Sequence, residues 1–247
     1  AVGTELTTGQ ITNTNATFLA KNLTELGAEV VAHFVVADDR AAIFNALGIC
    51  EALAEQVFVI GGLGPTTDDF TREVIAKWAN CDLEWRESAW TTLEKKMCSR
   101  GRQTRVSQRQ QCFFPKTALI LSNSKGTAEA FSVDIRKIKA WVLPGPPIEL
   151  ETIWAEEIAP QMRALIPGGP KEKLYSWVLK GKPEAEVGEI VEAVILESAL
   201  VGVRTGYRCY SPYVEVKIWV LNDLLPESKK KLEQCFVRLE EQLREWI

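Results

Sequence analysis

The chain has 247 residues, of which 46% are hydrophobic and 25% charged, and its formal net charge is −4. These values are typical of a soluble globular protein with one large or two smaller domains. A general nucleic-acid binder usually carries a basic excess, and a membrane span needs an apolar run of ~18 residues, which this chain lacks. No signal peptide precedes the first motif, so we expect a cytoplasmic protein that binds neither nucleic acid nor a membrane.

Helices and strands alternate in the first part of the chain. The spacing of apolar residues predicts helices at 13–27, 38–55 and 68–80 and strands at 28–36 and 56–62. The second of these helices is expected to open at Asp38 or Asp39. Because such an alternation produces βαβ units, it predicts a parallel sheet covered by helices on both faces.

Shorter elements and a second domain are predicted for the rest of the chain. Residues 87–112 have a helical pattern, and short strands at 118–122, 128–133 and 138–143 precede a helix at 147–163. The glycines and prolines of 165–173 predict a linker between domains spanning 1–167 and 171–247. The last part has the pattern of a small α+β domain: strand 173–180, helix 184–198, strands 201–207 and 213–221, and helix 226–246.

The cysteines and the histidine exclude some kinds of chemistry. Six cysteines without a C-x-x-C pair predict reduced, mostly buried thiols rather than disulfides or a zinc site. The single histidine, His33, lies in the predicted strand 28–36 and is expected to be a packed or edge residue. A Ser–His or Cys–His nucleophile pair would need that histidine, so this class of catalysis is set aside.

Segments rich in small and hydroxyl residues are the candidate ligand loops: 3–15, 61–69, 122–130 and 143–147. In a doubly wound sheet, ligands bind beyond the carboxyl ends of the strands, and backbone N–H groups in such loops favour phosphate. The first two loops also carry the carboxylates of Glu5, Asp68 and Asp69. Carboxylates repel a phosphate unless a divalent cation lies between them. The residues alone therefore predict a phosphate-containing small ligand, held with a metal.

A purely structural interpretation stays open for these groups. Asp68 could be the N-cap of its helix and Asp69 could favour the first turn through the helix dipole, while Glu5 could be a solvated loop residue. The "PGPP" stretch at 144–147 could be only a rigid turn. The three glycines of "GGLGP" are harder to explain in this way, because each adds conformational entropy to the unfolded chain.

Four stretches, in this order and spacing, resemble the CinA (competence/damage-inducible) family: "GTELTTGQITNTNATFLAKNLTELG", "GGLGPTTDDFT", "SKGTAEAF" and "LPGPPIELE". The resemblance implies an α/β fold with a three-layer MogA/MoaB-like, molybdopterin-binding-like domain over 1–167. It also implies a smaller α+β KH-like domain over 171–247, where "GYRCYSPYVEVKI" carries the likeness. A homodimer is expected, whereas the family's nicotinamide-nucleotide amidase activity is not, because the chain stops at Ile247.

The same resemblance implies a metal-dependent ADP-ribose pyrophosphatase, which yields AMP and ribose 5-phosphate. Divalent Mg, Mn or Co is the expected cofactor, and a monovalent cation is a further candidate. Glu5, Asp68 and Asp69 would hold the metal or position the water, with Arg109 as another catalytic residue. The residues expected to bind the nucleotide substrate are Thr14, Asn15, Asp38, Gly61, Gly62, Gly64, Pro65, Thr66, Gly126, Thr127, Pro144, Gly145 and Glu149.

Some positions depart from the family's pattern. Gln108 and Gln110 stand where asparagine and lysine are usual, and a glutamine cannot supply positive charge to a phosphate. Arg109 is expected to compensate, as a planar fork rather than a point charge. Glu129 adds an acid near the expected phosphate site, which disfavours an anion. These departures favour an alternative, a catalytically weak or inactive protein of the same fold that holds molybdopterin or a nucleotide.

The KH-like part raises RNA binding as a third interpretation. Residues 173–247 contain no G-x-x-G loop that could clamp a single strand, and the lysines at 229–231 have many glutamates nearby. A role in dimerisation or in closing over the active site is expected instead.

Overall fold

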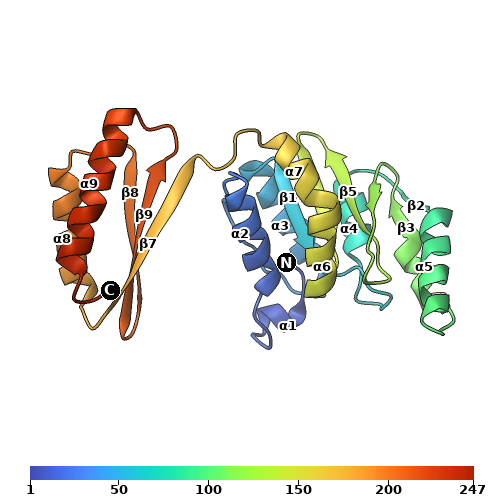
Figure 1. Ribbon diagram of the computed structural model, residues 1–247. Helices are drawn as coiled ribbons and strands as arrows, with labels where there is room; N and C mark the ends of the chain where they lie inside the picture. Colours follow the sequence, from blue (N-terminus) through green and yellow to red (C-terminus); the bar gives the residue numbers. More distant parts are fainter. The chain divides into compact units, whose positions relative to one another are not determined.

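The computed structural model describes all residues from 1 to 247 and shows two compact units, Ala1–Pro167 and Gly168–Ile247 (Figure 1). Two hydrophobic cores belong to the first unit and a third belongs to the second. The boundary falls inside the Gly- and Pro-rich stretch that composition marks as a linker.

A four-stranded sheet forms the centre of the first unit. Its strands, in spatial order, are β1 (Gln56–Ile60), β6 (Ile138–Leu143), β5 (Ala130–Ile135) and β4 (Leu119–Leu121). Only β1 and β6 are parallel, so the prediction of a parallel sheet is wrong for β4 and β5. The reason is a hairpin: two residues join β5 to β6, and Arg136 takes a positive φ of 55° there, which suits a tight turn between antiparallel strands.

The predicted strand at 28–36 is also absent, apart from one bridge between Val36 and Val2. The backbone of Ala1–Gly3 lies between this segment and β1: the Val2 N–H donates to Ile60 O at 2.8 Å and the Gly3 N–H to Val36 O at 2.9 Å. Before Val36 the segment borders an apolar cavity of about 410 Å³ instead of a neighbouring strand. Without a ladder partner an apolar run does not become a strand, and His33 is exposed rather than packed.

The sheet is the middle of three layers, which confirms the predicted α/β architecture. One core contains side chains of β1 together with α3 (Arg40–Leu53) and α4 (Thr71–Trp78). The other contains side chains of β1 together with α2 (Thr14–Glu25), α6 (Pro147–Ile153) and α7 (Ala159–Leu165). The division follows from the pleat, because alternate strand residues point to opposite faces. A π-helical segment, Trp154–Ile158, joins α6 to α7, and α1 (Thr4–Thr7) is a single turn.

The region 87–112, predicted to be helical, contains more than one element. It contains α5 (Glu87–Ser99) and the 3₁₀ segment Val106–Cys112, flanked by a two-stranded antiparallel sheet of β2 (Leu83–Trp85) and β3 (Phe113–Pro115). Gly101, with a φ of 66°, follows the end of α5 and explains why the helix does not continue.

The second unit has the predicted β-α-β-β-α order. Its elements are β7 (Glu172–Lys180), α8 (Glu184–Glu197), β8 (Val203–Tyr210), β9 (Tyr213–Leu221) and α9 (Pro226–Leu243). The strands form an antiparallel sheet in the order β7-β9-β8, and both helices cover one of its faces (Figure 1). Buried side chains of both helices pack there against alternate residues of β9.

All six cysteines are free, as predicted, but only Cys112 and Cys235 are buried, so the expectation of mostly buried thiols is wrong. No helix combines the length and the apolar character that crossing a membrane requires.

Candidate functional site

Several of the predicted loops meet at the carboxyl ends of β1 and β6. These parallel strands are in register at Ile60 and Leu143, so the loops that follow them leave the sheet side by side. The Gly61 N–H donates to Leu143 O at 2.9 Å, and Asn15 Nδ2 donates to Gly145 O at 2.7 Å. The start of α2 is thereby joined to the "PGPP" loop, and the glycine loop to the end of β6.

The glycine loop, residues 61–64, depends on glycine at more than one position. Gly61 and Gly62 have φ values of 99° and 67°, in the left-handed region that other residues rarely adopt. A Cβ atom on Gly61 would lie 2.5 Å from Val2 O, and one on Gly62 would lie 2.1 Å from Thr71 Oγ1. The Thr71 hydroxyl also donates to Gly61 O at 3.0 Å, which fixes the loop against the start of α4.

The paired aspartates precede α4 instead of starting it. The helix begins at Thr71 with Phe70 as its N-cap, so Asp68 is not the capping residue that the structural interpretation required. Asp69 closes a turn, because its Oδ2 accepts hydrogen bonds from the Thr66 N–H, at 2.9 Å, and from the Thr66 hydroxyl. Asp68 is exposed, and a hydrogen bond from the Thr66 side chain lowers the pKa of its carboxyl group, which therefore stays ionised. An exposed, ionised carboxylate in this position can contact a ligand.

The third predicted acid, Glu5, lies in α1 and is exposed, with its carboxylate folded back against Gly3. No group of three His, Cys, Asp or Glu side chains has an arrangement that could hold a metal ion. The structure therefore does not bring Glu5, Asp68 and Asp69 together as a complete set of ligands.

Asp38 has a structural role in the first loop. Its Oδ2 accepts hydrogen bonds from the Thr4 N–H at 2.7 Å and from the Thr4 hydroxyl at 2.9 Å. The neighbouring Asp39 caps α3, since its Oδ1 accepts the Ala42 N–H at 2.7 Å. Asp38 thus positions the segment that carries Glu5.

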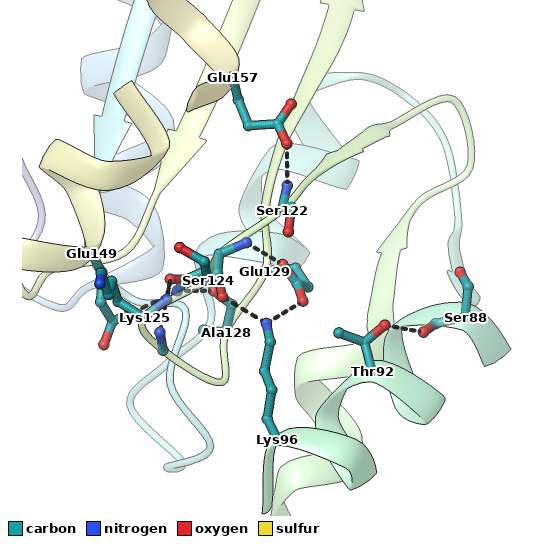
Figure 2. Close-up of polar contacts among 12 residues, drawn as sticks. Ser88, Thr92, Lys96, Ser122, Ser124, Lys125, Ala128, Glu129, Glu149 and Glu157 are labelled. Carbon is teal, nitrogen blue, oxygen red and sulfur yellow. Dashed lines mark hydrogen bonds and ion pairs between the residues drawn. The ribbon is translucent and has the colours of Figure 1, made fainter. Parts of the chain in front are cut away.

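A buried ion pair organises the fourth loop, 122–130, as Figure 2 shows. Lys96 Nζ of α5 lies 2.6 Å from Glu129 Oε1 and donates to Asn123 O at 2.7 Å, and Glu129 Oε2 accepts the Asn123 N–H at 2.6 Å. Asn123 Nδ2 then donates to Glu149 Oε2 at 2.7 Å, while its Oδ1 accepts the Gly126 N–H. This network connects the loop to the beginning of α6.

The network corrects the expectation that Glu129 disfavours an anion. Only 4% of Glu129 is exposed, and its carboxylate faces the Lys96 ammonium, which offsets its charge. A Cβ atom on Gly126 would lie 2.0 Å from Glu149 Oε2, so a larger residue there would require the Glu149 carboxylate to move.

The other departures from the family's pattern have structural partners as well. Gln110 Nε2 donates to Gly64 O at 3.1 Å and to Thr66 O at 2.7 Å, so this side chain fastens the glycine loop. Gln108 Oε1 accepts the Arg105 N–H at 2.9 Å. The Arg109 guanidinium lies over the Trp85 ring, 4.7 Å from its centroid, and makes no hydrogen bond to the glycine loop.

The remaining predicted positions also belong to these loops. Thr14 is the first residue of α2, Pro65 follows the glycines, Thr127 follows Gly126, and Pro144 is buried after β6. The large cavity beside β1 includes none of the predicted site residues in its lining.

Sequence reasoning missed Arg72, which is buried beneath the glycine loop. Its Nη1 donates to Leu63 O at 3.0 Å, and burial lowers its pKa to about 10. Burial likewise raises the pKa of the nearby Cys112 thiol to about 11. A charged residue in the first turn of a helix is usually exposed, so no local pattern distinguishes Arg72 from a surface residue.

Comparison with known proteins places this arrangement in a family. Residues 1–164 match the domain family described as "Probable molybdopterin binding domain". Competence-damage inducible proteins from Clostridium botulinum (strain Kyoto / Type A2) and Lysinibacillus sphaericus (strain C3-41) are 34% and 36% identical, over 78% and 79% of this chain. The chain spans about half the length of these relatives, 47% and 46%. A crystal structure of the protein CinA with unknown function from Thermoplasma acidophilum matches with a TM-score of 0.60 and 33% identity, covering 65% of this chain and 94% of that one.

Proposed function

We infer the function from one premise: the chain belongs to the CinA (competence/damage-inducible) family, and its first unit has the MogA/MoaB-like molybdopterin-binding fold. We propose that it hydrolyses the pyrophosphate bond of ADP-ribose, or of a related nucleotide diphosphate, to AMP and ribose 5-phosphate with the help of a divalent metal.

The observation that supports this proposal is the position of the two aspartates directly after the glycine loop, with Asp69 against Gly64. Gly61 follows the end of β1, and its N–H donates to the neighbouring strand β6. Asp69 lies against Gly64, because a Cβ atom added to Gly64 would be only 2.4 Å from Asp69 Oδ2. Close-packed glycine backbone suits a diphosphate, and adjacent carboxylates suit the cation that accompanies a diphosphate.

The acids fit a divalent metal in the manner usual for Mg²⁺, which takes one or two carboxylates and fills its other positions with phosphate oxygens and water. Asp68 and Asp69 would hold it, which requires no cluster of three protein ligands. When bound, such an ion would neutralise charge on the phosphate oxygens.

The chain's own residues would activate the water and hold the diphosphate. In the proposed reaction a water oxygen forms a bond to one phosphorus, the bond from that phosphorus to the bridging oxygen breaks, and the bridging oxygen leaves with the other phosphate. The exposed Asp68 carboxylate would accept the proton of the water. The glycine loop, fastened by Gln110 and Thr71, would keep the diphosphate in place.

Asp69→Asn is expected to lower the rate of AMP release from ADP-ribose at least tenfold, because the amide carries no charge for the cation. The measurement is chromatographic detection of AMP with Mg²⁺, Mn²⁺ or Co²⁺ present. Asp134→Asn is the matched control, since Asp134 is exposed in β5 near its hairpin with β6, at the end of the strand away from the loops. If the folded wild-type chain releases no AMP with any of these ions, the proposed activity is wrong.

A second candidate function, binding of a nucleotide or molybdopterin without turnover, is favoured by a specific observation. Gln110 uses its amide on the carbonyls of Gly64 and Thr66, so it brings no charge to a departing phosphate. Calorimetric binding of ADP-ribose by a wild-type chain that releases no AMP would select this candidate.

A further inference from the structure

Arg72 is a buried cation with few partners. Only 4% of the residue is exposed, and although Nη1 donates to Leu63 O, the Nε and Nη2 atoms have no hydrogen-bond partner. The guanidinium carbon lies 5.4 Å from the centroid of the Phe114 ring. No carboxylate forms an ion pair with it.

A buried charge of this kind is costly unless something compensates for it, because removing an ion from water costs several kcal/mol. The titratable groups whose charges act on Arg72 are Asp69 and Cys112. The Asp69 carboxylate accepts the Thr66 hydrogen bonds, keeps its negative charge and partly offsets the burial of Arg72 without forming an ion pair with it, while the raised pKa of the Cys112 thiol keeps that group neutral at ordinary pH. The Oε1 atom of Gln111, whose amide also donates to Leu63 O, has no partner either.

The Arg72 guanidinium is therefore a positive charge fixed beneath the glycine loop, only partly offset by Asp69. Arg72 and Gln111 both hold the Leu63 carbonyl, in the middle of the loop, and Gln110 holds the carbonyl of the next residue, Gly64. Arg109, which we expected to compensate for the absence of a lysine at position 110, lies over the Trp85 ring instead. An anion on the loop would be attracted by Arg72 through protein rather than through water, where screening is weak.

We propose that Arg72 is a positioning residue for the diphosphate: it fixes the glycine loop through the Leu63 carbonyl and supplies the positive charge that gives this loop its preference for an anionic ligand. This inference rests on the proposed function for the identity of the ligand, but it concerns binding and needs no turnover. Position 110 carries a glutamine where the family usually has a lysine, and Arg72 would supply the positive charge from beneath the loop instead.

The test compares Arg72→Lys with the wild-type chain across pH 6 to 9. Burial lowers the pKa of a lysine by up to ~3–5 units, so a lysine at this position should lose its charge within that range, whereas the guanidinium should keep it. The probe is the α,β-methylene analogue of ADP-ribose with Mg²⁺, and its Kd is measured by calorimetry. We expect the wild-type Kd to vary less than twofold and the Arg72→Lys Kd to rise at least fivefold towards pH 9.

Two controls separate charge from structure. Lys77→Met removes a positive charge from the exposed face of the same helix and should leave the Kd within twofold. Arg72→Met should bind weakly at every pH. If Arg72→Lys folds and its Kd follows the wild-type value at every pH, the inference is overturned and Arg72 has only a structural role.

The outcomes also distinguish this inference from the proposed function. Binding of the analogue with the expected pH dependence, but without AMP release from ADP-ribose, would contradict the activity and support the role of Arg72. Failure of the wild-type chain to bind either the analogue or inorganic pyrophosphate would overturn the inference itself.

Discussion

Replacing Lys96 by methionine is expected to lower the free energy of unfolding by about 3–5 kcal/mol, because the change leaves the Glu129 carboxylate buried without its cation. The Lys96 and Glu129 side chains are 17% and 5% exposed, so water cannot take the place of the ammonium group. Lys96 also donates to Asn123 O, so the methionine breaks two contacts of loop 122–130. Urea-induced unfolding followed by tryptophan fluorescence measures the loss.

The double variant Lys96→Met/Glu129→Met should recover much of this loss, since replacing both partners of a buried pair with apolar residues is often nearly neutral. Lys95→Met is the matched control: Lys95 is exposed on the same helix, and its replacement should change stability by less than about 0.5 kcal/mol. Equal effects of the Lys95 and Lys96 substitutions would contradict the claim that this ion pair organises the loop.

Gly61→Ala is expected to destabilise the chain by about 3 kcal/mol, since it combines backbone strain with a steric clash. The φ of Gly61 is 99°, and an added Cβ atom would lie 2.5 Å from the carbonyl oxygen of Val2, which is backbone and cannot rotate away. The clash would push the first loop from the end of β1 and would also weaken ligand binding. Thermal and urea unfolding measure the first effect.

Gly48→Ala is its natural control, because Gly48 lies inside α3 and an added Cβ atom would have no neighbour within 4 Å. That substitution should stabilise the chain by ~0.5–1 kcal/mol, the usual gain for alanine over glycine in a helix. A wild-type stability for Gly61→Ala would show that the loop approaches Val2 less closely than the structure indicates.

The elements with a strong local pattern could be predicted from the sequence. The β1 strand and the whole second unit have the predicted order and nearly the predicted bounds, because period-2 alternation, helical spacing and glycine at helix ends are properties of adjacent residues. The segment 28–36 has the same apolar pattern but forms no strand, because a strand also needs a neighbouring backbone for its hydrogen bonds. The antiparallel pairing of β5 with β6 likewise depended on a turn that β-α alternation does not reveal.

The candidate site divides in the same way. The glycines at 61–64 and the acids at 68–69 could be located from the sequence, because small residues and carboxylates directly after a strand are a local signature of a phosphate loop. Only the tertiary structure shows that Lys96 neutralises Glu129, that Arg109 stacks on Trp85 and that Arg72 is buried beneath the loop. Burial and charge pairing join residues tens of positions apart, and they depend on how helices pack against a sheet rather than on which residues are neighbours in the chain.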